Sequence, residues 1–170
     1  DDVSNSNVLL VYGFSENICP TNSSDDVDHR RRNKNSDGTA NCEWNREHTY
    51  AKSLGNPDLG TSGPGSDVHH LRASDVSRNS NRGSDKFAVG IGNSGPVGSN
   101  WYPGDEWKGD IARMMMYMYL RYGNQCLPKN VGVGATVAND SNMIDLFLNW
   151  NAEDPVSEVE RKRNTYVGNA

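Results

Sequence analysis

The dipeptide Glu47-His48, within the stretch NREHTYAKS, places a carboxylate directly beside an imidazole. An imidazole that is neutral near pH 7 can take a proton from water, and a carboxylate is a hard oxygen ligand for a divalent cation. Neighbouring side chains of a regular strand point to opposite faces, so both groups line one site only where the strand ends or bulges. A lone Glu–His pair is more simply explained as a structural contact, and the chemical interpretation therefore depends on other groups.

A second set of polar side chains begins at Asp67, in the stretch DVHHLRASDVSRNSNR. A strand is expected over Asp67–Ala73, and within Asp67–Leu71 of that strand Asp67 and His69 share one face. The His69-His70 pair lacks the i, i+4 spacing on a helix and the further ligands of a zinc protease, which argues against a zinc site.

The same stretch continues into a short expected helix. Ser74 is its expected N-cap and Gly83 its expected end. Asn79 and Arg82 are three residues apart and therefore share a face of this helix. A carboxylate and an amide oxygen together form a hard site that suits Mg²⁺, and a nearby arginine can clamp a phosphate with two hydrogen bonds.

The remaining elements must hold these groups in place. A strand or buried segment is expected over residues 7–13, followed by a polar surface excursion over 15–41 that Cys19 and Cys42 tether. These elements, the two strands and the short helix, with longer helices packed around them, predict an α+β fold.

Three longer helices are expected in the C-terminal half. Ile111, Met115, Met118 and Tyr122 follow helical spacing up to Gly123, and we interpret the methionines as core residues rather than as a binding groove. A second helix is expected over residues 140–151, with Ile144, Phe147 and Leu148 on one face. The last helix is expected to start from an Asp154 cap with Pro155 at its first position.

The composition limits the class of protein. The chain has 170 residues, a net charge of -5 and a mean hydropathy of -0.80, and it contains no apolar run long enough to span a bilayer. Any attraction to nucleic acid must therefore come from local basic clusters, since the overall charge is acidic. Three cysteines without a CxxC pair, and a start at DDVSNSN without Met, favour export over a thiol-based metal site.

Three blocks, REHTYAKSLG, DVHHLRASDVSRNSNRG and WYPGDEWKGDIARMMMYMYLRYG, occur in this order. Together they resemble the endonuclease I family of secreted and periplasmic bacterial nucleases, strongly over residues 42–124 and more loosely over 7–158. The resemblance implies a mixed α/β fold centred on a ββα-metal (His-Me) finger at about 43–84, with a helical part at about 105–167, all in one domain over 1–170. It also implies largely sequence-independent cleavage of DNA, and often of RNA, that leaves 5′-phosphate ends.

The resemblance also assigns roles to single residues. His48 stands at the position of the general base that activates water, and Glu47 and Asn79 stand at the positions of the metal ligands. Asp67 and His69 match a D-x-H-[NH]-L block. They are expected to lie around the metal ligands and the general base and to position them. The implied cofactor is Mg²⁺, which Mn²⁺ or Ca²⁺ can replace in the site.

The cationic residues are assigned less directly. Between His48 and Asp67 the chain has only Lys52 as a cation, where some relatives carry an arginine that steadies the cleaved phosphate. We therefore expect Arg82 and Arg46 to act in catalysis, and Arg72, Lys52 and Arg78 to bind substrate.

Several alternatives remain open from the sequence. If the chain is not a nonspecific endonuclease, three interpretations remain: a non-catalytic secreted module that binds nucleic acid or glycan, a site-selective HNH-type nuclease, or a zinc hydrolase. The resemblance implies DNA and RNA as partners, no membrane, a monomer, and a secreted or periplasmic bacterial location.

Overall fold

The computed structural model describes residues 6–13 and 30–169, in which helices combine with two-stranded antiparallel sheets in an α+β fold. Its strands are β1 (Asn7–Leu9), β2 (Arg31–Asn33), β3 (Trp44–His48), β4 (Leu71–Asp75), β5 (Gly95–Val97), β6 (Asn100–Tyr102), β7 (Thr136–Val137) and β8 (Asp140–Ile144). Its helices are α1 (Val76–Arg82), α2 (Lys108–Tyr122), α3 (Pro128–Val131), α4 (Asp145–Glu153) and α5 (Glu158–Gly168), and its 3₁₀ turns are η1 (Lys52–Leu54), η2 (Gly63–Ser66) and η3 (Gly123–Cys126).

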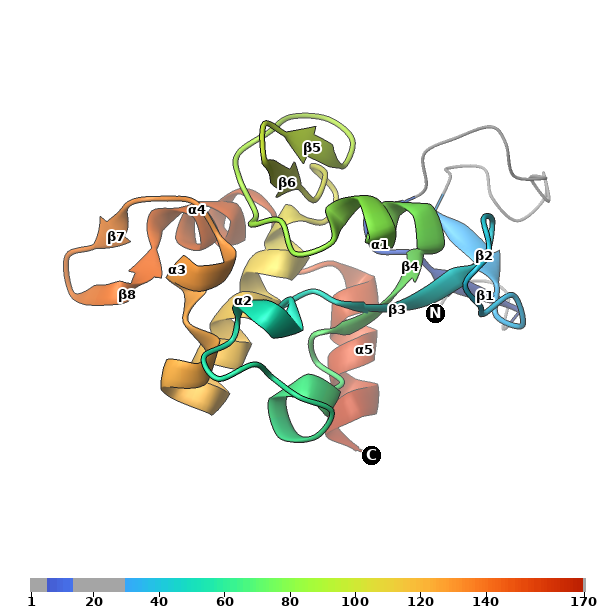
Figure 1. The fold of residues 1–170 in the computed structure, drawn as a ribbon, viewed down its shortest axis with the longest axis horizontal. Coiled ribbons are helices and arrows are strands. Elements are labelled where there is room, and N and C mark those ends of the chain that lie inside the picture. Colours follow the sequence, from blue (N-terminus) through green and yellow to red (C-terminus); the bar gives the residue numbers. More distant parts are fainter. Residues whose placement is uncertain (1–5, 14–29, 170) are drawn as a thin grey trace.

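Strands β3 and β4 pair antiparallel, and α1 follows β4 directly and lies across the pair (Figure 1). Helix α1 ends at Gly83, as expected, where φ is 52° and a side chain would be strained. Its cap is Asp75 rather than the expected Ser74, because Ser74 still pairs with Asn45 inside β4, and Asp75 Oδ1 accepts a 3.0 Å hydrogen bond from the Arg78 amide.

The prediction of a strand over Asp67–Ala73 is partly wrong, because β4 begins only at Leu71. Turn η2 ends at Ser66, and the His70 amide then donates back to the Asp67 carbonyl. The backbone of residues 67–70 is therefore a turn, and strand alternation does not determine where Asp67 and His69 point.

The N-terminal segment joins the same centre. Val11 forms a parallel bridge with Ser74, and its amide donates a 2.9 Å hydrogen bond to the Ala73 carbonyl. The chain then turns sharply, since Tyr12 has a φ of 74° and Gly13 of 63°. This turn brings the Tyr12 side chain into the core against Trp101, with ring centroids 5.7 Å apart.

Helix α2 forms the centre of the hydrophobic core, as the methionine spacing predicts. Ile111, Met115 and Met118 are each 0% exposed, and α4 packs along α2 with Phe147 and Trp150. The helix expected over 140–151 is partly wrong, because residues 140–144 form β8, which pairs with β7, before α4 begins. Leu148, expected on the buried face, is 41% exposed.

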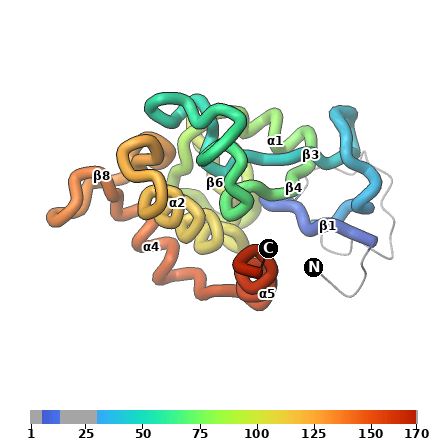
Figure 2. Tube along the Cα trace, turned by 90° about the horizontal axis from the view of Figure 1, so that it is seen from below, coloured from blue at the N-terminus to red at the C-terminus, as the bar shows by residue number. Residues whose placement is uncertain are grey.

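Helix α5 begins later than expected. Its cap is Ser157, whose side chain accepts from the Glu160 amide, whereas Asp154 Oδ2 instead accepts a 2.9 Å hydrogen bond from the Gly109 amide at the start of α2. In Figure 2, α5 lies at the lower edge of the molecule, and α1 and β3 lie at the upper edge. None of the helices in the described ranges is both long and apolar enough to cross a membrane.

Of the cysteines, Cys42 is in a disulfide and Cys126 is a buried free thiol. Cys19, the expected partner of Cys42 in the tether, lies outside the described residues.

Candidate active site

Glu47 lies on the face of β3 that α1 covers, and its carboxylate is 3% exposed. Its Oε1 accepts hydrogen bonds from the Tyr12 hydroxyl at 2.9 Å and from Arg82 Nη1 at 3.0 Å. Burial raises the pKa of Glu47, and the Arg82 guanidinium and the Tyr12 hydroxyl partly oppose this rise. Both side-chain donors reach Oε1, and among the described residues no side chain donates to Oε2; the His48 backbone N–H also donates to this carboxylate and lowers its pKa.

Asn79 lies on the opposing face of α1. Its Nδ2 donates 2.7 Å to the Asn45 carboxamide oxygen and reaches the Arg46 carbonyl at 3.5 Å. A backbone carbonyl only accepts, so this contact fixes which end of the amide is the nitrogen. Asn79 Oδ1 is therefore the end directed away from β3, and it has no partner among residues 6–13 and 30–169.

These two contacts together show how α1 lies on β3. Asn45 and Glu47 share a strand face, and Asn79 and Arg82 share a helix face, so the contacts Asn45–Asn79 and Glu47–Arg82 form two neighbouring pairs. The sequence-predicted metal ligands Glu47 and Asn79 belong to adjacent pairs. In the described ranges Glu47 Oε2 has no side-chain donor and Asn79 Oδ1 has no partner, so these are the oxygens through which the two residues could bind a hard cation.

His48 ends β3 and is half-buried. Its Nε2 lies 3.0 Å from the Gly65 carbonyl, and because a carbonyl only accepts, this nitrogen carries the proton. The neutral ring then presents Nδ1 as its basic nitrogen. Burial lowers the pKa of His48, and the charges of Lys52 and Arg46 lower it further, so the ring is neutral at pH 7.

The Gly65 carbonyl is held by its own turn. His70 is fully buried, its Nε2 lies 2.7 Å from the Pro64 carbonyl, and its ring centroid lies 5.6 Å from that of His48. Gly65 itself is packed so tightly that a Cβ would collide with the Gly60 carbonyl. This close packing fixes the backbone of η2 at Gly65, and with it the carbonyl that contacts the His48 ring.

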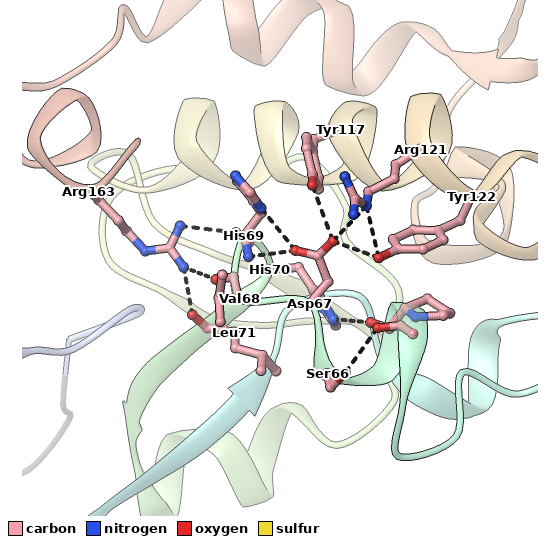
Figure 3. Close-up of polar contacts among 12 residues, drawn as sticks. Ser66, Asp67, Val68, His69, His70, Leu71, Tyr117, Arg121, Tyr122 and Arg163 are labelled. Carbon is pink, nitrogen blue, oxygen red and sulfur yellow. Dashed lines mark hydrogen bonds and ion pairs between the residues drawn. The ribbon is translucent and has the colours of Figure 1, made fainter. Parts of the chain in front are cut away.

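Asp67 connects this turn to helix α2 (Figure 3). Its Oδ2 accepts hydrogen bonds from Tyr122 at 2.7 Å and Tyr117 at 3.2 Å, and it lies 3.3 Å from Arg121 Nε. Its Oδ1 accepts from the His69 amide at 2.9 Å and lies 3.0 Å from the His69 ring. Burial raises the pKa of Asp67. The hydrogen bonds from Tyr122 and His69 outweigh this effect and hold the pKa below its usual range.

The pairing of Asp67 with His69 therefore anchors the residues that follow η2. The His69 ring stacks on Tyr117, with centroids 4.1 Å apart, and Arg163 of α5 donates to the carbonyls of Val68, His69 and Leu71 (Figure 3). Asp67 and His69 hold the backbone that follows Gly65, whose carbonyl contacts His48. They do not contact Glu47 or Asn79 in the hydrogen bonds that the described part of the chain shows.

The expected roles of Arg82 and Arg72 need correction. Arg82 is 1% exposed, and its guanidinium donates to Glu47 and to the carbonyls of His48 and Thr49. It therefore cannot reach a substrate phosphate. Arg72 is also buried, 3.6 Å from Asp110 and stacked over Trp107. Arg78 donates 2.6 Å to the Ser94 carbonyl and lies over Trp101, but it is only half-buried, and its expected role in substrate binding stays a prediction.

Arg46 and Lys52 are the cations that the structure does place beside His48. Arg46 is exposed and lies two residues from His48 on the same face of β3, and Lys52 is half-buried in η1. After burial, both charges also lower the pKa of His48, because they disfavour the imidazolium.

Sequence reasoning missed Tyr12, Asn45 and Gly65. Asn45 had a usable signal, because it lies two residues before Glu47 and strand alternation places the two on one face. Tyr12 and Gly65 had none. The first reaches Glu47 through a contact across 35 residues, and the second contributes only a backbone carbonyl.

Comparison with known proteins shows what the chain is similar to. The chain is 41% identical over 172 residues to an extracellular ribonuclease of Bacillus subtilis (strain 168), covering 95% of this chain and 54% of that protein. It is 41% identical over 147 residues to an extracellular ribonuclease of Bacillus amyloliquefaciens, covering 80% of this chain and 50% of that protein. The chain thus spans about half the length of these curated relatives. The family model described as Endonuclease I matches residues 2–170, and the chain therefore belongs to the endonuclease I family.

Proposed function

We propose that the chain is a divalent-metal-dependent endonuclease that hydrolyses phosphodiester bonds of DNA and RNA without sequence preference and leaves 5′-phosphate ends. The observation that carries the proposal is the contact of β3 with α1. It leaves Glu47 Oε2 without a side-chain donor and Asn79 Oδ1 without a partner in the described ranges, and His48, which follows Glu47 at the end of β3, has Nδ1 as its basic nitrogen.

Glu47 and Asn79 are the residues that would hold the cation, which we expect to be Mg²⁺, with Mn²⁺ or Ca²⁺ able to replace it. When bound, such an ion offsets the negative charge that develops on the phosphate and on the leaving oxygen. Burial raises the pKa of Glu47, so the carboxylate competes for protons when the cation is absent. The affinity for the metal should therefore fall as the pH is lowered.

His48 would act as the general base. Its Nδ1 takes the proton from the water that attacks phosphorus, while the Gly65 carbonyl keeps Nε2 protonated and the ring in one orientation. The lowered pKa of His48 keeps Nδ1 free of a proton at neutral pH, which a base needs before the reaction starts. The two neighbours therefore divide the work: Glu47 binds the metal and His48 prepares the water.

Arg46 and Lys52 would attract the nucleic-acid backbone to this face. Contacts to phosphate position a strand without reading its bases, which supports cleavage without sequence preference. With a net charge of -5, the protein depends on these local cations, and we expect binding to weaken steeply as salt is raised.

The relatives support RNA as a substrate, because both are named extracellular ribonucleases. Their names and the Cys42 disulfide also support a secreted bacterial protein, since disulfides persist in oxidising compartments. We further propose that the chain forms one nuclease domain and works as a monomer.

Incubation of a supercoiled plasmid and of a long RNA with the protein, in Mg²⁺ and in EDTA, tests the proposal. We expect a smear of fragments from both substrates in Mg²⁺, 5′-phosphate ends on the products, and no cleavage in EDTA. Substitution of His48 by Ala should lower the rate by about 10²–10⁴-fold. Cleavage in EDTA, discrete fragments, or a His48→Ala variant that cuts at the wild-type rate would contradict it.

A further inference from the structure

A groove of about 620 Å³ runs along the outer side of the β3–β4 pair. Its walls are the loop 37–39, the first part of β3 from Trp44 to Arg46, the strand segment Leu71–Ala73, and Arg163 of α5. Its volume lies within the range of pockets that hold small ligands, about 300–1,000 Å³. Arg46, which we expect to attract the nucleic-acid backbone, lines this groove, whereas Glu47, His48 and Asn79 do not.

The groove reaches the active site along one strand face. Trp44, Arg46 and His48 alternate along β3 and so share a face, and in the antiparallel register Arg46 lies opposite Ala73 and His48 opposite Leu71. Ala73 and Leu71 both line the groove. A chain that passes His48 along this face therefore enters the groove next.

The walls combine three kinds of group that suit a nucleotide. Trp44 gives an aromatic ring, half-buried and held in place because its indole N–H donates 3.1 Å to the Asn33 carbonyl. Arg46 is exposed, and its guanidinium makes no contact that the described residues show. Asp37 and Thr39, both exposed, add an acceptor and a hydroxyl. A carboxylate repels phosphate, so the base or the sugar, which offer N–H and O–H donors, fits beside Asp37.

We propose that this groove is a nucleotide subsite, in which Trp44 stacks on one unpaired base further along the strand from the scissile bond and Arg46, between Trp44 and His48, contacts a phosphate. The proposal rests on the nuclease function above and specifies it: the site takes single-stranded or locally unpaired nucleic acid, because a base inside a duplex is stacked on both faces. Stacking on an aromatic side chain accepts every base, and so agrees with cleavage that has no sequence preference.

Tryptophan fluorescence gives a first test without any change to the groove. The chain has four tryptophans, and Trp101, Trp107 and Trp150 are at most 5% exposed, so Trp44 alone is open to an external quencher. In Mg²⁺, with His48→Ala used to prevent cleavage, a short single-stranded RNA should quench the emission and protect Trp44 from acrylamide. A Trp44→Phe substitution should abolish the quench.

A set of RNAs that each lack one base gives the decisive test. In the His48→Ala background, loss of one particular base should weaken binding about five- to a hundredfold, the effect of one base–aromatic stack. In this background, Trp44→Phe should keep the dependence on that base, and Trp44→Ala should remove it. When His48 is present, the single variant Trp44→Ala should still cleave intact RNA, but with a higher KM than the wild type.

Two results would overturn the subsite: no single base matters, or the same base matters equally in Trp44→Ala. Displacement of the RNA by an unstructured peptide, with no dependence on any base, would instead assign the groove to a protein segment. Failure of the nuclease proposal is seen separately, as a wild-type protein that leaves RNA and plasmid intact in Mg²⁺.

Discussion

The Asn45 carboxamide oxygen accepts a 2.7 Å hydrogen bond from Asn79 Nδ2, across the contact between β3 and α1. The bond turns the Asn79 amide so that its oxygen, the atom that a cation would bind, is directed away from the strand. Residues that orient metal ligands in this way commonly matter nearly as much as the ligands themselves.

Substitution of Asn45 by Ala should therefore weaken the metal site. We expect the Mg²⁺ concentration at half-maximal cleavage to rise about ten- to a hundredfold, with little change in the rate at saturating Mg²⁺. Asn41→Ala is a matched control, because Asn41 also contacts α1, through Ser77, but not Asn79. An unchanged Mg²⁺ midpoint in Asn45→Ala would show that the Asn79 amide needs no such support.

Gly65 gives a test of the base that leaves the metal site untouched. An alanine at this position collides with the Gly60 carbonyl and must move the carbonyl that holds His48. We expect kcat to fall about ten- to a hundredfold while the Mg²⁺ midpoint stays constant, since misplacing a catalytic group by about 1 Å has effects of this size.

Gly168→Ala is the control for this change, because a Cβ at Gly168 meets nothing within 4 Å. A Gly65→Ala variant with wild-type kcat would mean that the Gly65 carbonyl is not what orients the His48 ring.

The pH profile of cleavage should report the lowered pKa of His48. Only the neutral ring accepts a proton, so kcat/KM should fall in acid with a midpoint below 6.5, the ordinary pKa of histidine. Lys52→Gln and Arg46→Gln each remove a positive charge that disfavours the imidazolium. Both changes should therefore raise the pKa of His48 and move the acidic limb to higher pH, Lys52→Gln further than Arg46→Gln.

The control for these two variants is Lys34→Gln, a charge removal on an exposed residue next to β2, which should leave the limb in place. A limb that moves to lower pH in Lys52→Gln would contradict the assignment of this limb to His48.

The correction of Arg82 leads to a prediction about stability. Arg82 and Glu47 form an ion pair in which the side chains are 0% and 3% exposed, so removal of one partner leaves a buried charge without compensation. Arg82→Met should lower the free energy of unfolding by about 3–5 kcal/mol, measured by urea denaturation. Arg46→Met, at an exposed site, should change it by no more than about 0.5 kcal/mol.

Replacement of both partners, Glu47→Met with Arg82→Met, should recover part of this loss, because no unpaired charge remains. If Arg82→Met were as stable as the wild type but inactive, Arg82 would act on the substrate after all.

The sequence allowed helices α1 and α2 to be predicted for physical reasons that are local. Asn79 and Arg82 share a helix face because they are three residues apart, and Gly83 ends α1 because its φ of 52° suits glycine. The spacing of Ile111, Met115 and Met118 predicted α2 and its buried face in the same way.

What the sequence could not show depends on distant contacts. Exposure of an arginine is decided by its partners, and those of Arg82 and Arg72 lie on other elements of the chain. The start of α5 was missed because Asp154, a good cap in isolation, binds the Gly109 amide of α2 instead. The strand prediction fails over 67–70 because the His70 amide donates back to the Asp67 carbonyl and folds the backbone on itself, which the residue types do not indicate.

The central claim is that Glu47 and Asn79 hold one divalent cation while His48 separately activates water. Cleavage rate measured against Mg²⁺ concentration, for the wild type, Asn79→Ala and His48→Ala, tests it most directly. The account predicts that His48→Ala lowers the plateau about 10²–10⁴-fold at an unchanged Mg²⁺ midpoint. It predicts that Asn79→Ala instead moves the midpoint to higher Mg²⁺. A wild-type plateau in His48→Ala, or a wild-type midpoint in Asn79→Ala, would contradict it.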